Sequence, residues 1–191
     1  MEHVALSDQQ LTYLARADPQ LKPKFYGVVP CDGLPKSPVK DKPKGYIVNT
    51  DPRGQPGQHW IALWTQDNVC EVVDSYALPL DFYHQATPLK DWVMKHWTDV
   101  MGNGRSFQGL HSKGCGHYAL MYLKCRARDR NLQDFTNNFS TYDRVTNDHD
   151  VGQMIQALIT EEQEARGWTK VCGCTPHQTC QSPHDQMITP C

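Results

Sequence analysis

Residues 45–74 read GYIVNTDPRGQPGQHWIALWTQDNVCEVVD and hold three apolar runs that are separated by turn-forming residues. The runs at 46–48, 59–64 and 69–73 are rich in β-branched and aromatic residues, which favour strands. The connections between them contain Gly, Pro, Asp and Asn, the residues that turns prefer. Because strands that follow one another this closely pair as hairpins, the stretch predicts an antiparallel meander.

Helical spacing of apolar residues flanks the meander on both sides. The pattern predicts four helices, over 7–17, 87–101, 115–127 and 151–164. The helix at 115–127 is apolar on nearly every side, as expected for a buried central helix. A short strand is also expected at 106–108. Strands followed by helices predict an α+β fold, in which a mixed, mainly antiparallel β-sheet is flanked by helices.

Residues 18–57 hold eight of the 13 prolines. Six lysines and only two acids lie between Lys22 and Lys44. We expect an irregular, solvated surface segment here, with regular structure beginning at Gly45. The alternative is a docking patch for an anion or an acidic partner.

The composition is that of a soluble globular domain: 39% of the 191 residues are hydrophobic and 21% are charged. The formal net charge of −2 argues against nucleic-acid binding driven by bulk charge. No apolar run approaches the ~18 residues of a membrane span, and the N-terminus lacks a secretory pattern. We therefore expect an intracellular, monomeric protein with one domain over 1–170, whose eight cysteines are thiols or metal ligands.

The expected tail at 171–191 is rich in Cys and His. Cys172, Cys174, His177 and Cys180 offer sulfur and nitrogen ligands that a tetrahedral zinc site uses, although their spacing is not that of a standard zinc finger. The alternatives are a flexible tail with reduced thiols and a tail linked to a partner by disulfides. No metal is expected to take part in the chemistry of the domain itself.

Cys115 is the cysteine whose setting suggests chemistry. It lies between Gly114 and Gly116, at the predicted start of the central helix. The N-terminus of a helix presents unpaired N–H groups and a positive partial charge, and both favour a thiolate. The two glycines let the backbone approach a substrate carbonyl closely.

A cysteine nucleophile requires a base, and the base requires an orienting group. His59 begins a buried strand, and Asp74 closes the next strand, with Glu71 as the nearest alternative acid. If the two strands form a hairpin, Asp74 lies beside His59 and holds its ring in one tautomer. Gln108 is a candidate donor to an oxyanion, together with the backbone N–H of Cys115. Taken singly, these residues also suit a packed histidine, a turn-capping aspartate and a buried thiol.

Four sequence elements together resemble the adenovirus protease family, adenain, over about residues 45–125. They are Gly57-Gln58-His59-Trp60, then Asp74, then Gln108-Gly109 and finally Cys115-Gly116. The family consists of cysteine endopeptidases of the same clan as the SUMO and ubiquitin-like-protein proteases. The resemblance implies a papain-like active-site arrangement, in which the central helix begins at the catalytic cysteine.

By this resemblance His59 is the base, Asp74 the orienting acid, Gln108 the oxyanion donor and Cys115 the nucleophile. Trp60, Gly114 and Gly116 are expected to contact the substrate. Adenovirus enzymes commonly have Glu where Asp74 stands. They also anchor an activating peptide through a cysteine in the region of 95–100, where this chain has none.

The activity implied is cleavage of viral precursor proteins after small residues such as Gly, during maturation of the particle. By the same resemblance the protein acts in the host-cell nucleus and the virion, and a peptide or DNA activates it, while the chemistry itself requires no cofactor. A deubiquitinase or deSUMOylase is the alternative within the same chemistry. An acyltransferase with the same triad, or an inactive scaffold that binds a partner, are further alternatives.

Overall fold

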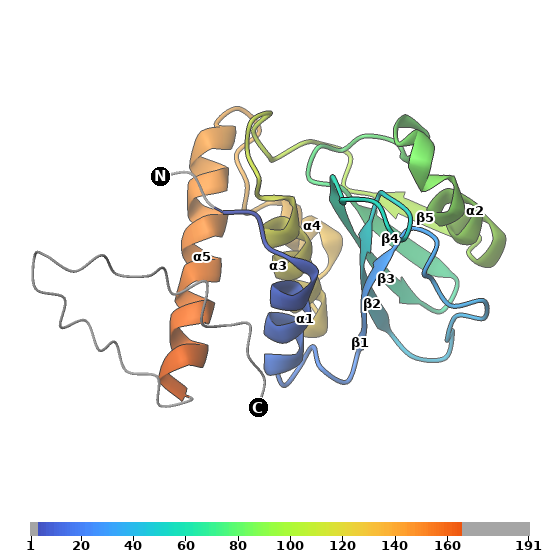
Figure 1. Ribbon diagram of the computed structural model, residues 1–191, viewed down its shortest axis with the longest axis horizontal. Helices are drawn as coiled ribbons and strands as arrows, with labels where there is room; N and C mark the ends of the chain where they lie inside the picture. Colours follow the sequence, from blue (N-terminus) through green and yellow to red (C-terminus); the bar gives the residue numbers. More distant parts are fainter. Residues whose placement is uncertain (1–3, 166–191) are drawn as a thin grey trace, which may run out of the picture.

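A five-stranded β-sheet separates one helix from four others in the computed structural model, which describes residues 4–165 (Figure 1). The strands lie side by side in chain order, and the central three form the predicted antiparallel meander. Each edge strand pairs in parallel with its neighbour. The strands are β1 (Phe25–Pro30), β2 (Lys44–Asn49), β3 (Trp60–Gln66), β4 (Val69–Val73) and β5 (Asp99–Gly102).

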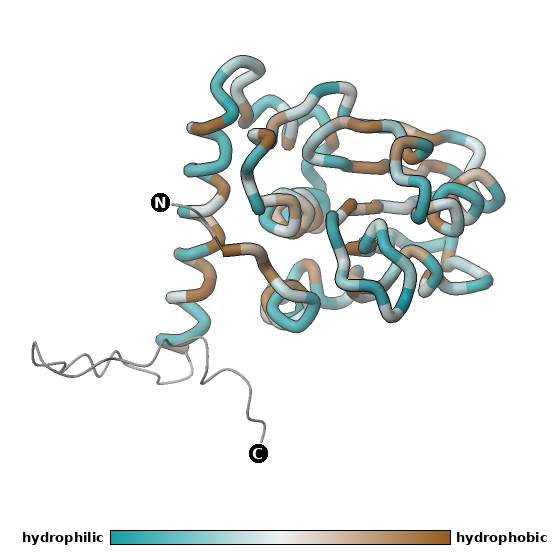
Figure 2. The backbone as a smooth tube through the Cα atoms, turned by 45° about the horizontal axis from the view of Figure 1, so that its top comes forward, coloured by the Kyte–Doolittle hydropathy of each residue, from teal (hydrophilic) through white to brown (hydrophobic). Residues whose placement is uncertain are grey.

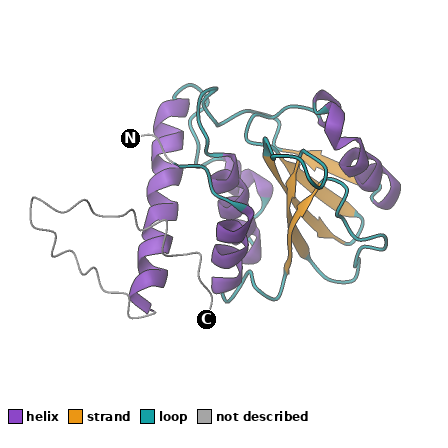
Figure 3. Ribbon diagram, viewed as in Figure 1, coloured by secondary structure: helices purple, strands orange, loops and turns teal. Residues whose placement is uncertain are grey.

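The helices form layers on both faces of the sheet, which confirms the predicted α+β architecture (Figure 3). Within residues 4–165, α2 is the one α-helix on one of the faces, and two short 3-10 helices, η1 and η2, precede it. On the other face α1 and α3 pack against the sheet, and α5 lies outside them. The helices are α1 (Asp8–Ala17), η1 (Leu80–Phe82), η2 (His84–Ala86), α2 (Thr87–His96), α3 (Cys115–Ala127), α4 (Leu132–Thr136) and α5 (Arg144–Ala165).

Helix α3 is the buried central helix that its composition predicts. Eight of its residues are buried, among them Tyr118, Leu120 and Leu123, because the helix lies between the sheet and α5. Hydrophobic segments of the chain gather in the sheet and around this helix, whereas α5 alternates between apolar and polar residues along its length (Figure 2). Among residues 4–165, no helix has the length and apolar content needed to cross a bilayer.

Helix α1 begins with a reciprocal cap. The Ser7 hydroxyl accepts from the backbone N–H of Gln10, and the Gln10 side chain accepts from the N–H of Ser7. Its buried face consists of Leu11, Leu14 and Ala15, as the spacing predicts. The cap and the apolar face together explain why the helix starts and packs where it does.

Two buried carboxylates tie α3 to its surroundings. Asp18, at the end of α1, lies 2.6 Å from Lys124 Nζ and 2.9 Å from Arg128 Nη2. Burial acts to raise the pKa of Asp18, but the hydrogen bonds and charges of its partners outweigh burial and lower it to about 2. Glu71 accepts from the Tyr122 hydroxyl and lies 2.8 Å from Arg126 Nε. Glu71 therefore faces α3 and is engaged away from His59.

Several sequence-based expectations are wrong at the edges of the sheet. Strand β1 lies within the proline-rich segment that was expected to be irregular, and it is an edge strand, where Pro30 at its end is tolerated. The helix expected over 87–101 ends at His96, because Trp97 adopts an extended backbone and the chain continues as β5.

Three further boundaries differ. Residues 106–108 form no strand, and the N–H groups of Phe107 and Gln108 both donate to the Ser75 carbonyl instead. Helix α5 begins at Arg144, seven residues before the expected start, and the short helix α4 was not expected. The tail at 171–191, with the candidate zinc ligands Cys172, Cys174, His177 and Cys180, lies outside the described residues.

Candidate active site

Cys115 is the first residue of α3, and its side chain is half-buried at the wall of a cleft of about 1040 Å³. Gly114 precedes it as the N-cap residue. The thiol therefore lies at the end of the helix where unpaired backbone N–H groups and the positive end of the dipole are found. This position is the one that the sequence predicts for the nucleophile.

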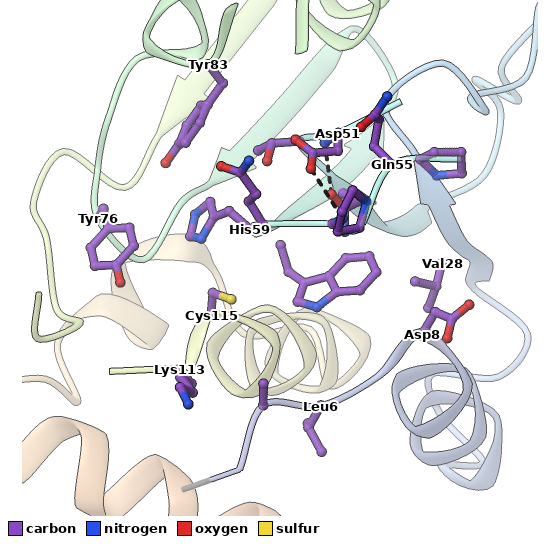
Figure 4. A pocket seen from close by; sticks show the side chains of 18 of the residues that line it. Leu6, Asp8, Val28, Asp51, Gln55, His59, Tyr76, Tyr83, Lys113 and Cys115 are labelled. Atoms are coloured by element: carbon purple, nitrogen blue, oxygen red, sulfur yellow. Dashed lines mark hydrogen bonds between the residues drawn. The ribbon is translucent and has the colours of Figure 1, made fainter. Parts of the chain in front are cut away.

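His59 lies immediately before β3, with 6% of its surface exposed, and faces Cys115 across the cleft (Figure 4). Its Nε2 atom is 2.7 Å from Oδ1 of Asp74, so Nδ1 is the ring nitrogen left for Cys115. Burial acts to lower the pKa of His59, but the hydrogen bonds to Asp74 and Cys115 and their charges raise it to about 9. The raised pKa favours the imidazolium form of the ring, which lies between a carboxylate and the sulfur.

Asp74 follows β4 directly, and the hairpin brings it beside His59. Ala62 and Val73 form the last pair in the register, and Asp74 and His59 lie one and three residues beyond them, past the ends of their respective strands. The carboxylate also accepts from the backbone N–H groups of Tyr76 and Leu78, at 2.9 and 3.2 Å. Burial acts to raise the pKa of Asp74, and the His59 contact and the other donors outweigh it and hold the pKa below its usual value.

Two tyrosines complete the setting of the histidine, and sequence reasoning missed both. Tyr76 and Tyr83 stack against the His59 ring, with centroids 5.1 and 5.4 Å away. The register of the hairpin is the signal that could have identified Tyr76. Ala62 pairs with Val73, and continuing this register by three residues on each strand places Tyr76 opposite His59. Tyr83 comes from the η1–η2 connection, and no periodic pattern in the sequence identifies it.

Gln108 lies in the cleft wall with 1% of its surface exposed, and both ends of its side-chain amide are hydrogen-bonded. Its Oε1 accepts from the Ser75 hydroxyl. Its Nε2 donates to the Tyr76 hydroxyl at 3.1 Å and to the Ser112 carbonyl at 2.8 Å. Both protons of the amide are therefore used within the protein, and donation to an oxyanion requires the exchange of one of these bonds.

The three residues expected to contact substrate occupy different positions. Trp60 lines the cleft, whereas Gly114 and Gly116 are buried and are not part of its lining. A Cβ on Gly116 would lie 3.2 Å from the Trp60 ring and 3.4 Å from Leu11. The absence of a side chain at Gly116 thus lets Trp60 and α1 pack closely against the start of α3, and a substrate contact at this residue stays a prediction.

The cleft extends well beyond the reactive group. Figure 4 shows Leu6, Asp8 and Val28 on one side of Cys115, and Tyr76 and Lys113 on the other. The loop before His59 forms a further wall, where Asp51 accepts from the backbone N–H of Gly57 at 3.2 Å. Residues that line the cleft therefore lie on more than one side of the thiol. The four cysteines within the described residues, Cys31, Cys70, Cys115 and Cys125, are all free thiols.

Neither a protein-family model nor a curated protein matches the sequence. Among solved structures, the chain is similar to a selenomethionine form of the ASFV pS273R protease, with 21% identity and a TM-score of 0.35. That match covers 53% of this chain and 40% of the other, so the chain spans less than half of that protein. A second structure of the same protease matches at 15% identity and a TM-score of 0.41, over 74% and 67% of the two chains.

A third match is the SUMO protease Ulp1 with its catalytic cysteine oxidised to a sulfinic acid. It has 16% identity and a TM-score of 0.42, over 81% of this chain and 79% of the other. At these identities the likeness concerns the arrangement of the chain.

Proposed function

We propose that the protein is a cysteine endopeptidase. The observation that carries the proposal is the line of contacts from Asp74 through His59 to Cys115 in the wall of an open cleft. A base oriented by a carboxylate and placed against a cysteine at a helix N-terminus is the arrangement that nucleophilic catalysis requires. The protonated His59 is the form that pairs with a thiolate and that later acts as an acid.

In the proposed reaction, Cys115 Sγ attacks the scissile carbonyl carbon, and a C–S bond forms as the carbonyl π bond opens. As the tetrahedral intermediate collapses, the C–N bond breaks and His59 gives its proton to the leaving amine. Water then gives a proton to His59 and attacks the thioester. The new carboxylic acid leaves, and Cys115 returns to the thiolate.

The oxyanion of the intermediate is proposed to lie between the Cys115 backbone N–H and the Gln108 amide. The Gln108 N–H that now donates to the Tyr76 hydroxyl at 3.1 Å is the one proposed to turn to the oxyanion. Its hydrogen bond is longer than the 2.8 Å bond to the Ser112 carbonyl. Removing one donor from such a site costs about 10²–10³ in kcat.

The substrates proposed are precursor proteins, viral ones by the resemblance, cleaved after small residues such as Gly. The support from the structure is the position of Trp60, whose ring lies over Gly116, the residue next to the nucleophile. We propose that the indole, which also lines the cleft, narrows it beside the thiol. A residue without a side chain passes most easily through such a constriction.

Two electrophilic probes test the function. One is a Gly-Gly peptide that ends in a vinyl sulfone, and the other is a ubiquitin or SUMO conjugate with the same electrophile. We expect the peptide probe to label the wild type and Cys125→Ala, but not Cys115→Ala. Labelling by the conjugate alone would favour the deubiquitinase or deSUMOylase alternative. Failure of both probes, repeated with added DNA, would contradict the protease.

A further inference from the structure

Helix α5 holds the loop that carries Gln108, although it comes from a part of the chain to which the sequence assigned no function. Asp148 Oδ2 accepts from the backbone N–H of Gly109 at 3.0 Å. Asn147, which is buried, donates through Nδ2 to the Phe107 carbonyl at 3.1 Å. The peptide groups on both sides of Gln108 are therefore held by two consecutive residues of α5.

Asp148 also contacts the helix that carries the nucleophile. The Tyr118 hydroxyl donates to Asp148 Oδ1 at 2.9 Å, and Tyr118 lies on α3, three residues after Cys115. Burial and the nearby Asp148 carboxylate raise the pKa of Tyr118, so the hydroxyl stays protonated as a donor. One carboxylate thus joins the start of α3 to the residue that follows Gln108.

Gly109 shows how close this contact is. A Cβ at this position would lie 2.7 Å from Asp148 Oδ2, nearer than real Cβ contacts allow. On the other side of the loop, the N–H groups of Phe107 and Gln108 donate to the carbonyl of Ser75, the residue after Asp74. The backbone of Gln108 is therefore fixed between the triad end of the sheet and α5.

We propose that Asp148 is a positioning residue for the oxyanion site, acting through the loop of Gln108, with Asn147 supporting the same loop. This inference rests on the proposed endopeptidase function. Asp148 reaches neither the thiol nor the histidine through any of these hydrogen bonds. The effect that we expect is therefore on the stabilisation of the tetrahedral intermediate, and the reactivity of the thiol serves as the comparison.

The first test is the kinetics of peptide cleavage by Asp148→Ala. We expect kcat to fall about 10- to 100-fold, with KM nearly unchanged. This loss is smaller than the roughly 10²- to 10³-fold loss in kcat expected when an oxyanion donor is removed altogether. Iodoacetamide should alkylate Cys115 at the same rate in Asp148→Ala as in the wild type, because this reaction forms no oxyanion. Asp150→Ala removes a carboxylate two residues further along α5. It should leave kcat, KM and the alkylation rate unchanged. Asp148→Asn keeps one acceptor and should recover part of kcat, and it serves if the alanine variant folds poorly.

A double-mutant cycle separates positioning from a general structural role. In a Gln108→Ala background, Asp148→Ala should lower kcat by less than about twofold, because the group through which it acts is already gone. Equal losses in both backgrounds, or an unchanged kcat in Asp148→Ala, would overturn the inference while the protease stands. A wild type that cleaves no peptide would instead overturn the proposed function. In that case, the NMR resonances of the Gln108 side-chain amide show whether Asp148 holds the loop. Asp148→Ala should shift these resonances, and Asp150→Ala should not.

Discussion

The hydroxyl of Tyr83 donates a 2.7 Å hydrogen bond to Oδ2 of Asp74, the carboxylate oxygen that His59 does not use. Burial and the carboxylate raise the pKa of Tyr83, so its hydroxyl remains a donor throughout the neutral range. The same tyrosine stacks its ring against His59. One side chain thus restrains both members of the acid–base pair.

Tyr83→Phe isolates the hydroxyl, since the ring can still stack on His59. We expect kcat/KM for peptide cleavage to fall about three- to tenfold, because Asp74 loses one of its donors and holds the imidazole less firmly. Tyr142→Phe removes a hydroxyl from a tyrosine that is 96% exposed, and it should have no effect. Equal rates for the wild type and Tyr83→Phe would show that the backbone donors alone orient Asp74.

Cys115→Ala should abolish turnover and keep the fold, because Ala suits the first turn of α3. The measurement is peptide hydrolysis, together with the midpoint of urea unfolding. Cys125→Ala changes a half-buried thiol on the same helix and should retain activity. Hydrolysis by Cys115→Ala would remove the nucleophile from the proposal.

Asp74→Asn should lower kcat by up to ~10⁴, the loss known for the equivalent change in a serine triad. It should also lower the free energy of unfolding by about 2 kcal/mol, because an amide N–H₂ then faces donors that the carboxylate now satisfies. A loss of activity below about tenfold would mark Asp74 as a cap of the turn.

The raised pKa of His59 predicts how stability depends on pH. Folding raises this pKa from 6.5 to about 9, so the stabilisation is complete below 6.5 and is lost as the pH rises through 9. We expect the free energy of unfolding of the wild type, relative to His59→Gln, to decline by up to about 3 kcal/mol over this range. Urea unfolding of both proteins at several pH values provides the comparison. A difference that stays constant with pH would show that His59 gains no charged partners on folding.

Asp18 offers a test of the ionic contact between α1 and α3. Asp18→Asn should lower the free energy of unfolding by about 3 kcal/mol, because Lys124 and Arg128 lose their buried partner. With a folded pKa of about 2, the stabilisation by Asp18 is present above 3.8 and is lost as the pH falls through 2.

The matched control for Asp18 is Asp129→Asn. Asp129 pairs with Lys24 at 3.6 Å, but its side chain is 93% exposed. Asn also tolerates the positive φ of 58° at this position, so we expect almost no change in unfolding. A similar loss in both variants would contradict a special role for the buried pair.

The sequence by itself determined the features that depend on neighbours along the chain. The meander over β2–β4, the cap and apolar face of α1 and the burial of α3 follow from local periodicity, and the structure confirms them. The positions of His59 and Asp74 follow as well, because a tight hairpin brings together residues that are close in sequence.

Only the tertiary structure decided what depends on distant parts of the chain. Strands β1 and β5 pair in parallel at the edges of the sheet. Parallel pairing needs a crossover connection, and the path of the crossover across the sheet is set by packing and not by the local pattern. The close packing of Trp60 and Leu11 against Gly116 is likewise a tertiary contact, because it joins three separate elements. The contacts of Tyr83 with Asp74 and of Asp148 with Gly109 join loops to other elements, and such contacts form only when the whole core packs.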